Sequence, residues 1–143
     1  ESERWWRYAE PWLERADLVR GSDEDFEWMG MTPDGVLERG ASVVIQTLGP
    51  DGVDVHLRGG GTVRVPSRSV EVVDTVGAGD SFCGAVLTQL HERGAVGRGI
   101  TSLSADEWRE IASFAVEVAG ITVSRAGANP PYRAEISRDV AGA

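Results

Sequence analysis

The spacing of hydrophobic residues along the chain switches several times between helical and strand-like. Residues 2–15 and 104–123 carry an apolar side chain every three or four positions, which predicts amphipathic helices. Residues 42–47 form a β-branched run that is typical of a buried strand. Apolar residues alternate with polar ones at 53–57 and 63–65, on either side of a glycine run, which predicts a β-hairpin. This mixture of helices and strands favours an α/β layer architecture.

Shorter segments complete the pattern. Ser22 precedes three acidic residues and predicts a helix start, and Ser104 with Glu107 matches a capping box. Gly40 and Gly94 stand where helices are expected to end. Together these signals predict a strand at 17–20, helices at 23–30 and 33–39, a strand at 70–73, and a helix from about 80 to 93.

Composition restricts the function more than it restricts the fold. The chain has 143 residues, 41% hydrophobic and 26% charged, which suits one globular domain with a single core. Its formal net charge of −9 argues against a nucleic-acid partner, because phosphate backbones attract basic surfaces. All 14 basic residues are arginines, so any mechanism that needs a lysine is excluded.

The cellular setting is also indicated by the sequence. One cysteine, Cys83, excludes an internal disulfide and suits a reducing compartment. No apolar run is long enough to span a membrane, so we expect a cytoplasmic protein without a membrane partner. The chain opens with Glu1 and an apolar helical stripe, and we expect another segment of the same protein to pack against that stripe.

The segment from Asp74 to Asp80 (DTVGAGD) carries the clearest chemistry. Gly77 and Gly79 let backbone N–H groups converge at a predicted helix start, which makes an anion site suited to phosphate. A carboxylate at position 80 would compete with that phosphate, so it needs another purpose, such as removing a proton from an attacking alcohol. The alternative is that Asp80 only favours the helix dipole and the glycines only serve the turn.

Two other phosphate-binding motifs do not fit. The sequence GxxxxGK[ST] is absent. A dinucleotide-binding interpretation of Gly77 and Gly79 places Phe82 where glycine or alanine is required, and no strand with a ribose-binding acid follows.

Four segments resemble the PfkB, or ribokinase-like, carbohydrate kinases, and the resemblance covers nearly the whole chain. The most specific is DTVGAGDSF at 74–82, which matches the C-terminal signature of that family. TLGPDG at 47–52 resembles its nucleotide-side turn, RGSDED at 20–25 its K-x-[NS]-x-x-E segment, and TVSRAGA at 122–128 its C-terminal turn. The resemblance implies a three-layer α/β/α sandwich of ribokinase type. Residues 1–143 would form only the C-terminal, nucleotide-binding portion, without the N-terminal half that holds the sugar-binding residues and the lid.

The resemblance also implies specific roles. Asp80 would act as the catalytic base, and the N–H groups of Gly77, Ala78, Gly79 and Asp80 would form the anion hole. The residues at the nucleotide would be Ser22, Thr47, Gly49, Gly52 and Gly79. Asp25 would help to hold Mg²⁺ through water, and a monovalent cation, usually K⁺, would lie at Asp74, Val76, Arg125 and Gly127.

The implied activity is transfer of the γ-phosphate of ATP to a hydroxyl of a small sugar, with fructose as the first expectation and a homodimer as a common state of the family. Three departures bear on this expectation: Arg20 replaces the common lysine, Asp25 replaces the usual glutamate, and Val116 replaces a small polar residue near the adenine. The alternative functions are a nucleotide-binding module or an inactive kinase relative, and a purely structural domain.

Overall fold

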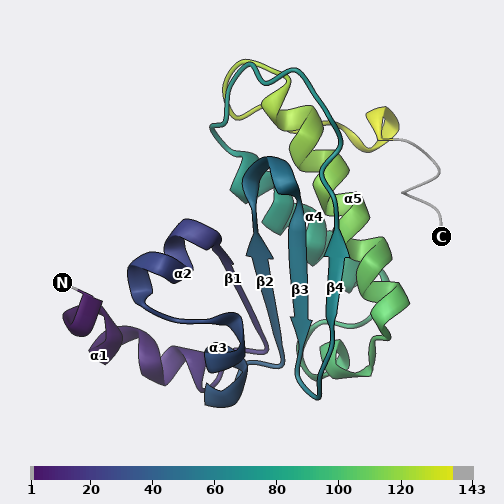
Figure 1. Cartoon of the computed structure of the whole chain (residues 1–143). Coiled ribbons are helices and arrows are strands. Elements are labelled where there is room, and N and C mark those ends of the chain that lie inside the picture. The colour runs from purple at the N-terminus through teal and green to yellow at the C-terminus, as the bar shows by residue number, and fades with distance from the viewer. Residues whose placement is uncertain (1, 137–143) are drawn as a thin grey trace.

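The computed structural model of the chain describes residues 2–136, apart from the side chains of residues 2–4, 6, 7 and 98 (Figure 1). Among residues 2–136, five helices and four strands follow one another in the order that the sequence predicts, except for one strand. The helices are α1 (Ser2–Leu13), α2 (Asp23–Met29), α3 (Pro33–Arg39), α4 (Ala78–Glu92) and α5 (Ala105–Val123). The strands are β1 (Leu18–Ser22), β2 (Val43–Thr47), β3 (Val53–Leu57) and β4 (Thr62–Val65). Short 3₁₀ helices occupy Gly49–Asp51, Gly97–Ser102 and Arg133–Glu135.

The four strands form one sheet in the order β1-β2-β3-β4. β1 and β2 are parallel, with α2 and α3 in the connection between them, and the other two pairs are antiparallel. In the register, Ser22 lies opposite Thr47, Thr47 opposite Val53, and Val53 opposite Val65. The carboxyl ends of β1, β2 and β4 therefore share one edge of the sheet, which is where ligands bind in open α/β sheets.

Helices cover both faces of the sheet, as the three-layer prediction requires (Figure 1). Side chains alternate along β2, so Val43 and Ile45 enter one core while Val44 enters the other. The larger core joins the sheet to α4 and α5 and includes the fully buried Trp108. The smaller core lies under α2 and α3 and includes Phe26.

The predicted helix boundaries are confirmed because they rest on local hydrogen bonds. Ser22 caps α2: its hydroxyl accepts from the N–H of Asp25 at 3.0 Å, and the Asp25 carboxylate accepts from the N–H of Ser22 at 2.8 Å. Ser104 and Glu107 form the same reciprocal pair at the start of α5. Gly40 ends α3 with φ of 143°, a conformation that side chains rarely adopt.

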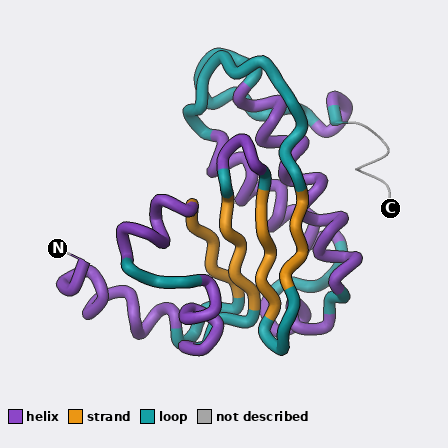
Figure 2. Tube along the Cα trace, in the orientation of Figure 1, coloured by secondary structure: helices purple, strands orange, loops and turns teal. Residues whose placement is uncertain are grey.

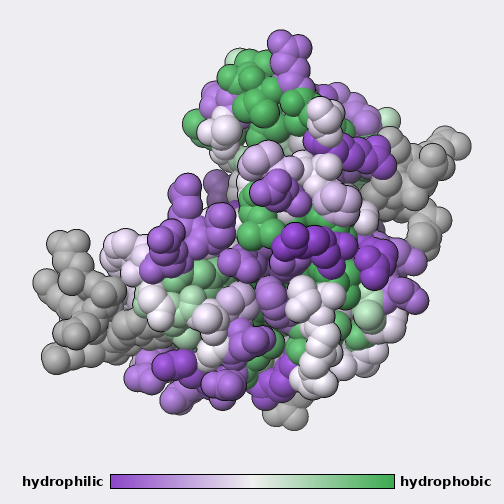
Figure 3. Space-filling model, viewed as in Figure 1, coloured by the Kyte–Doolittle hydropathy of each residue, from purple (hydrophilic) through white to green (hydrophobic). Residues whose placement is uncertain are grey.

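The strand predicted at 70–73 is wrong. This segment has no strand partner and belongs to the long loop that arches over the end of the sheet (Figure 2). The N–H groups of Val73 and Asp74 both donate to the carbonyl of Val123, at the end of α5, at 2.8 and 3.1 Å. Val72 and Val73 are about 60% exposed, and the loop carries an apolar patch on the surface (Figure 3). The backbone of this segment thus bonds to the end of a helix instead of adding a strand to the sheet.

Candidate active site

The glycine turn before α4 is the segment where the sequence predicts an anion site. Gly77 precedes the helix in the left-handed region, with φ of 79°. A Cβ atom on Gly77 would lie 2.6 Å from the Cβ of Ala128, so the turn from the C-terminal segment also leaves no room for a side chain. The first N–H groups of a helix have no partner within it, which leaves the amides of Gly79 and Asp80 available at the positive end of α4.

Asp80 lies in the first turn of α4 and is exposed. It borders a cavity of about 530 Å³ between α4, α5 and the C-terminal segment, lined at the same end by Gly77 and Ser81. Within residues 2–136 its carboxylate makes no hydrogen bond or ion pair with another side chain. The carboxylate is therefore at the mouth of the glycine turn and open to a substrate, where the sequence predicts a base.

The predicted nucleotide residues follow the shared edge of the sheet. Thr47 ends β2, and its hydroxyl lies 3.4 Å from the carbonyl of Gly21 on β1. Gly49 and Gly52 follow in left-handed conformations, with φ of 53° and 99°, and close the turn into β3. Ser22 ends the neighbouring strand opposite Thr47. The structure thus brings the predicted nucleotide residues of β1 and β2 together at one edge.

One residue that the sequence did not place in the site connects this edge to the glycine turn. Arg20 donates from Nη2 to the hydroxyl of Thr47 at 3.1 Å. Both of its terminal nitrogens lie 3.0 Å from the position that a Cβ on Gly79 would take. The signal for Arg20 was its place in the RGSDED segment, where relatives carry lysine.

Asp25, the predicted magnesium residue, is tied to its own helix. Hydrogen bonds from the backbone and then from the hydroxyl of Ser22 lower the pKa of its carboxyl, with a smaller contribution from Arg20. The capping bond uses Oδ2, so Oδ1 remains available to a hydrated ion. Over the part of the chain that the structure describes, no three His, Cys, Asp or Glu side chains gather to hold a metal.

Asp74 connects the two turns that were predicted to hold a monovalent cation. Its Oδ1 accepts from the N–H of Val76 at 3.0 Å, and its Oδ2 accepts from the N–H of Gly127 at 2.9 Å. Arg125 lies at the same turn after α5, and its side chain pairs with Glu135. Because both carboxylate oxygens already accept backbone hydrogen bonds, a cation here would be held largely by carbonyl oxygens of the two turns.

This bridge predicts a pH-dependent stability. Hydrogen bonds from Val76 and then Gly127 hold the pKa of the Asp74 carboxyl below its ordinary value, which is about 3.9. A depressed pKa stabilises the fold fully above the ordinary value, and that stabilisation is lost as pH falls through the lower, folded pKa. Asp74→Asn should therefore lower the melting temperature at pH 7, because the two N–H groups bond to different carboxylate oxygens and asparagine replaces one of these acceptors with an NH₂ donor. The difference from wild type should shrink below about pH 4. Thermal unfolding from pH 3 to pH 7 checks this, and a difference that does not vary with pH contradicts it.

No helix among residues 2–136 is both long and apolar enough to cross a bilayer.

Comparison with known proteins points to the same family as the sequence motifs. The family model described as pfkB family carbohydrate kinase matches residues 5–135. A fructokinase of Rhizobium leguminosarum bv. trifolii is 40% identical over 82 residues, which cover 53% of this chain and 25% of the relative. A putative sugar kinase of Pyrococcus horikoshii is 32% identical over 116 residues, which cover 81% of this chain and 33% of the relative.

Solved structures agree in fold. The Pyrococcus sugar kinase in complex with ATP matches with a TM-score of 0.75 at 25% identity, over 97% of this chain and 43% of that one. A fructokinase of Xylella fastidiosa with bound ATP matches with a TM-score of 0.76 at 23% identity, over 89% of this chain and 41% of that one. The chain therefore spans less than half the length of these relatives and has part of the ribokinase-like α/β fold. With the family model matching almost all of it, the chain belongs to the pfkB family of carbohydrate kinases.

Proposed function

We propose that the protein to which this chain belongs transfers the γ-phosphate of ATP to a hydroxyl group of a small sugar. The observation that carries the proposal is the exposed carboxylate of Asp80 beside the glycine turn at the start of α4. A turn that only binds phosphate does not require an acidic side chain beside it. An acid that only stabilises the start of a helix does not require a neighbouring cavity. Together they suit a base that faces the end of a bound triphosphate.

In the proposed reaction, Asp80 accepts the proton of the sugar hydroxyl as its oxygen attacks the γ-phosphorus. An oxygen–phosphorus bond forms to the sugar, the bond from the γ-phosphorus to the bridging oxygen breaks, and ADP leaves with that oxygen. Of the four predicted anion-hole N–H groups, that of Ala78 donates to the carbonyl of Thr75 at 3.2 Å. Those of Gly77, Gly79 and Asp80 are therefore the proposed donors to the negative charge on the transferred group, as preorganised donors are in other phosphoryl and acyl transfers. Mg²⁺, when bound with ATP, would neutralise charge on the phosphates, with Asp25 reaching it through water.

The nucleotide is expected along the shared edge of the sheet. Ser22, Thr47, Gly49 and Gly52 surround the ends of β1 and β2, and Gly79 lies beside Arg20 at the same place. Bound K⁺ would fit between the turns that Asp74 connects, at the carbonyls of Val76, Arg125 and Gly127. A cation at that position would hold the turn of Gly77 in the conformation that the anion site requires.

The acceptor is proposed as fructose first, with ribose, a deoxy-sugar acid or a nucleoside as the other candidates. Sugar-binding and lid residues are proposed to come from a preceding segment of the same protein. A homodimer formed through the lid is proposed as well, because it is a common state of the family. The lone Cys83 suits the cytoplasm. Residues 1–143 alone are expected to show little or no turnover, since positioning of both reactants supplies much of the catalysis.

The test is ADP production from Mg²⁺-ATP by the protein with its complete kinase domain, across a panel of these acceptors. Sugar-dependent ADP release with formation of one sugar phosphate supports the proposal. Stabilisation by Mg²⁺-ATP in a thermal shift, with no sugar consumed, would instead indicate a nucleotide-binding module. An unfolding temperature that no nucleotide changes would indicate a structural domain.

A further inference from the structure

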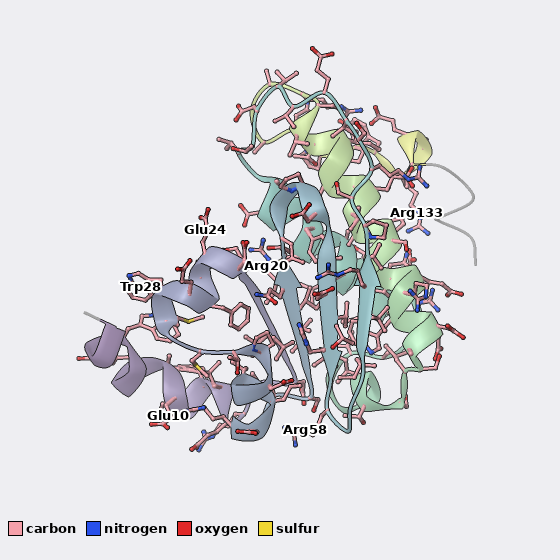
Figure 4. The ribbon with its side chains drawn as sticks, viewed as in Figure 1. Glu10, Arg20, Glu24, Trp28, Arg58 and Arg133 are labelled. Carbon is pink, nitrogen blue, oxygen red and sulfur yellow. The ribbon has the colours of Figure 1, made fainter. Side chains whose placement is uncertain are left out.

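The guanidinium of Arg20 occupies a position between the two halves of the proposed nucleotide site. Arg20 extends from β1 and lies between α2 and β2 (Figure 4). Its Nη2 donates to the hydroxyl of Thr47 at 3.1 Å, and both Nη atoms lie 3.0 Å from the Cβ position of Gly79. One side chain thus contacts the end of β2 and the first turn of α4. Gly79 is the residue that makes this approach possible, because any larger side chain would meet the guanidinium.

The charge of Arg20 is not neutralised by the protein in the part of the chain that the structure describes. No carboxylate among these residues lies within 4.0 Å of its nitrogens. Its Nε atom is buried and has no hydrogen-bond partner among them. The pKa of Asp25 is lowered mainly by hydrogen bonds from Ser22 and to a smaller extent by the positive charge of Arg20. The two side chains form no ion pair. A partly buried cation without a counter-charge is costly, which indicates that this position is built to receive an anion.

The anion that fits is a phosphate, because the neighbouring groups are also phosphate donors. The guanidinium stands against the N-terminal turn of α4, where the backbone N–H groups and the helix dipole favour negative charge. Helix start and guanidinium would repel each other unless a negative group lies between or beside them. A guanidinium also has five donors in a fixed plane, so it can keep its bond to Thr47 and still offer other N–H groups to phosphate oxygens.

We infer that Arg20 binds the terminal phosphate of the nucleotide and stabilises the phosphoryl group during transfer, using Thr47 to fix the plane of its guanidinium. This inference rests on the proposed function, since it assigns a residue to the same site. It adds a phosphate-contacting side chain to an anion hole that otherwise consists of backbone amides. It also predicts that lysine cannot replace arginine at this position, because a single point charge cannot hold Thr47 and a phosphate in the same geometry.

The competing role is structural, in which Arg20 only braces β1, β2 and α4. Three measurements separate the two roles. If Arg20 contacts phosphate, its loss should weaken the binding of a non-hydrolysable ATP analogue more than the binding of ADP. It should also lower kcat more than it raises the KM for ATP. Free guanidine should partly restore the turnover of Arg20→Ala. A brace predicts a lower melting temperature with none of these three effects.

The experiment uses Arg20→Ala, Arg20→Lys and the control Arg15→Ala in the protein with its complete kinase domain. Arg15 is an exposed arginine that lies outside the cavity and the nucleotide edge. We expect Arg20→Ala to lower kcat/KM by about 100-fold, as for loss of one donor to transition-state charge. We expect Arg20→Lys to recover no more than about a tenth of the wild-type value and Arg15→Ala to stay within about twofold of it. Calorimetric titration should show that Arg20→Ala binds the ATP analogue about tenfold more weakly than wild type does, while its affinity for ADP changes by less than about threefold.

Failure of this inference and failure of the proposed function give different results. If wild type consumes no sugar, the proposed function fails, and the ATP analogue titration still decides whether Arg20 contacts phosphate. If wild type is active but Arg20→Ala stays within about threefold of it, the inference is overturned while the kinase assignment stands. Full activity in Arg20→Lys overturns the part that requires a guanidinium. If Arg20→Ala does not fold, Arg20→Lys and Arg20→Gln give the same comparison of ATP analogue with ADP.

Discussion

Asp80→Asn in the protein with its complete kinase domain is expected to reduce sugar-dependent ADP production by about 1000-fold, within the range for loss of a general base. The amide keeps the size of the side chain and cannot accept a proton. Asp80 faces the cavity and is exposed, so its replacement disturbs no packing. ATP affinity is expected to stay within about twofold or to rise slightly, because a negative charge beside the phosphates is removed. Turnover is measured by ADP release and affinity by calorimetric titration.

The matched control for this prediction is Asp106→Asn. Asp106 is also an exposed acid in the first turn of a helix, but it begins α5 and does not line the cavity. If Asp80 served only the helix dipole, both replacements would change stability by a few tenths of a kcal/mol and neither would change turnover. An Asp80→Asn protein that keeps more than about a tenth of the wild-type rate contradicts its role as base.

The features that the sequence predicted correctly are those that depend on neighbours in the chain. The N-cap at Ser22 and the capping box at Ser104 involve residues three positions apart, and both form as predicted; Asp25 in addition completes a capping box at Ser22. The turn at Gly77 is of the same kind, because its left-handed conformation and the helix that follows are specified by adjacent residues. The alternation of β2 between two cores also follows from a local pattern, since a buried strand must supply apolar side chains to both faces.

The features that it did not predict depend on contacts between distant segments. The valines at 70–73 alternate as in a strand, but whether a strand forms depends on an available partner, and the end of α5 takes that place. Arg20 and Gly79 are 59 positions apart, so no local pattern could show that the guanidinium lies against the glycine. The burial of the first helix is similarly non-local: Trp12 lies in the apolar stripe predicted over residues 2–15, yet it is 77% exposed.

The same dependence on distant contacts makes Gly52 the glycine whose replacement should destabilise the fold most. Gly52 is buried between the 3₁₀ turn and β3, with φ of 99°. A Cβ atom at this position would lie 2.1 Å from the carbonyl oxygen of Val65 and 2.6 Å from the backbone nitrogen of Ser67. Both obstacles are backbone atoms at the end of β4, so rotating a side chain cannot relieve the clash. Gly52→Ala is therefore expected to lower the free energy of unfolding by roughly 3 kcal/mol or more, through strain at a positive φ and displacement of β4.

Gly49→Ala in the same turn separates the two causes. Gly49 also has a positive φ, of 53°, but a Cβ there would have nothing within 4 Å. It should cost only about 1 kcal/mol, the conformational penalty of a left-handed alanine. Urea unfolding of both variants, compared by midpoint with the slope held equal, measures the difference. Equal losses in the two variants would mean that the end of β4 moves aside without cost, whereas a larger loss for Gly52→Ala would show that this glycine is required by the close approach of β4, independently of any contact that it makes with a nucleotide.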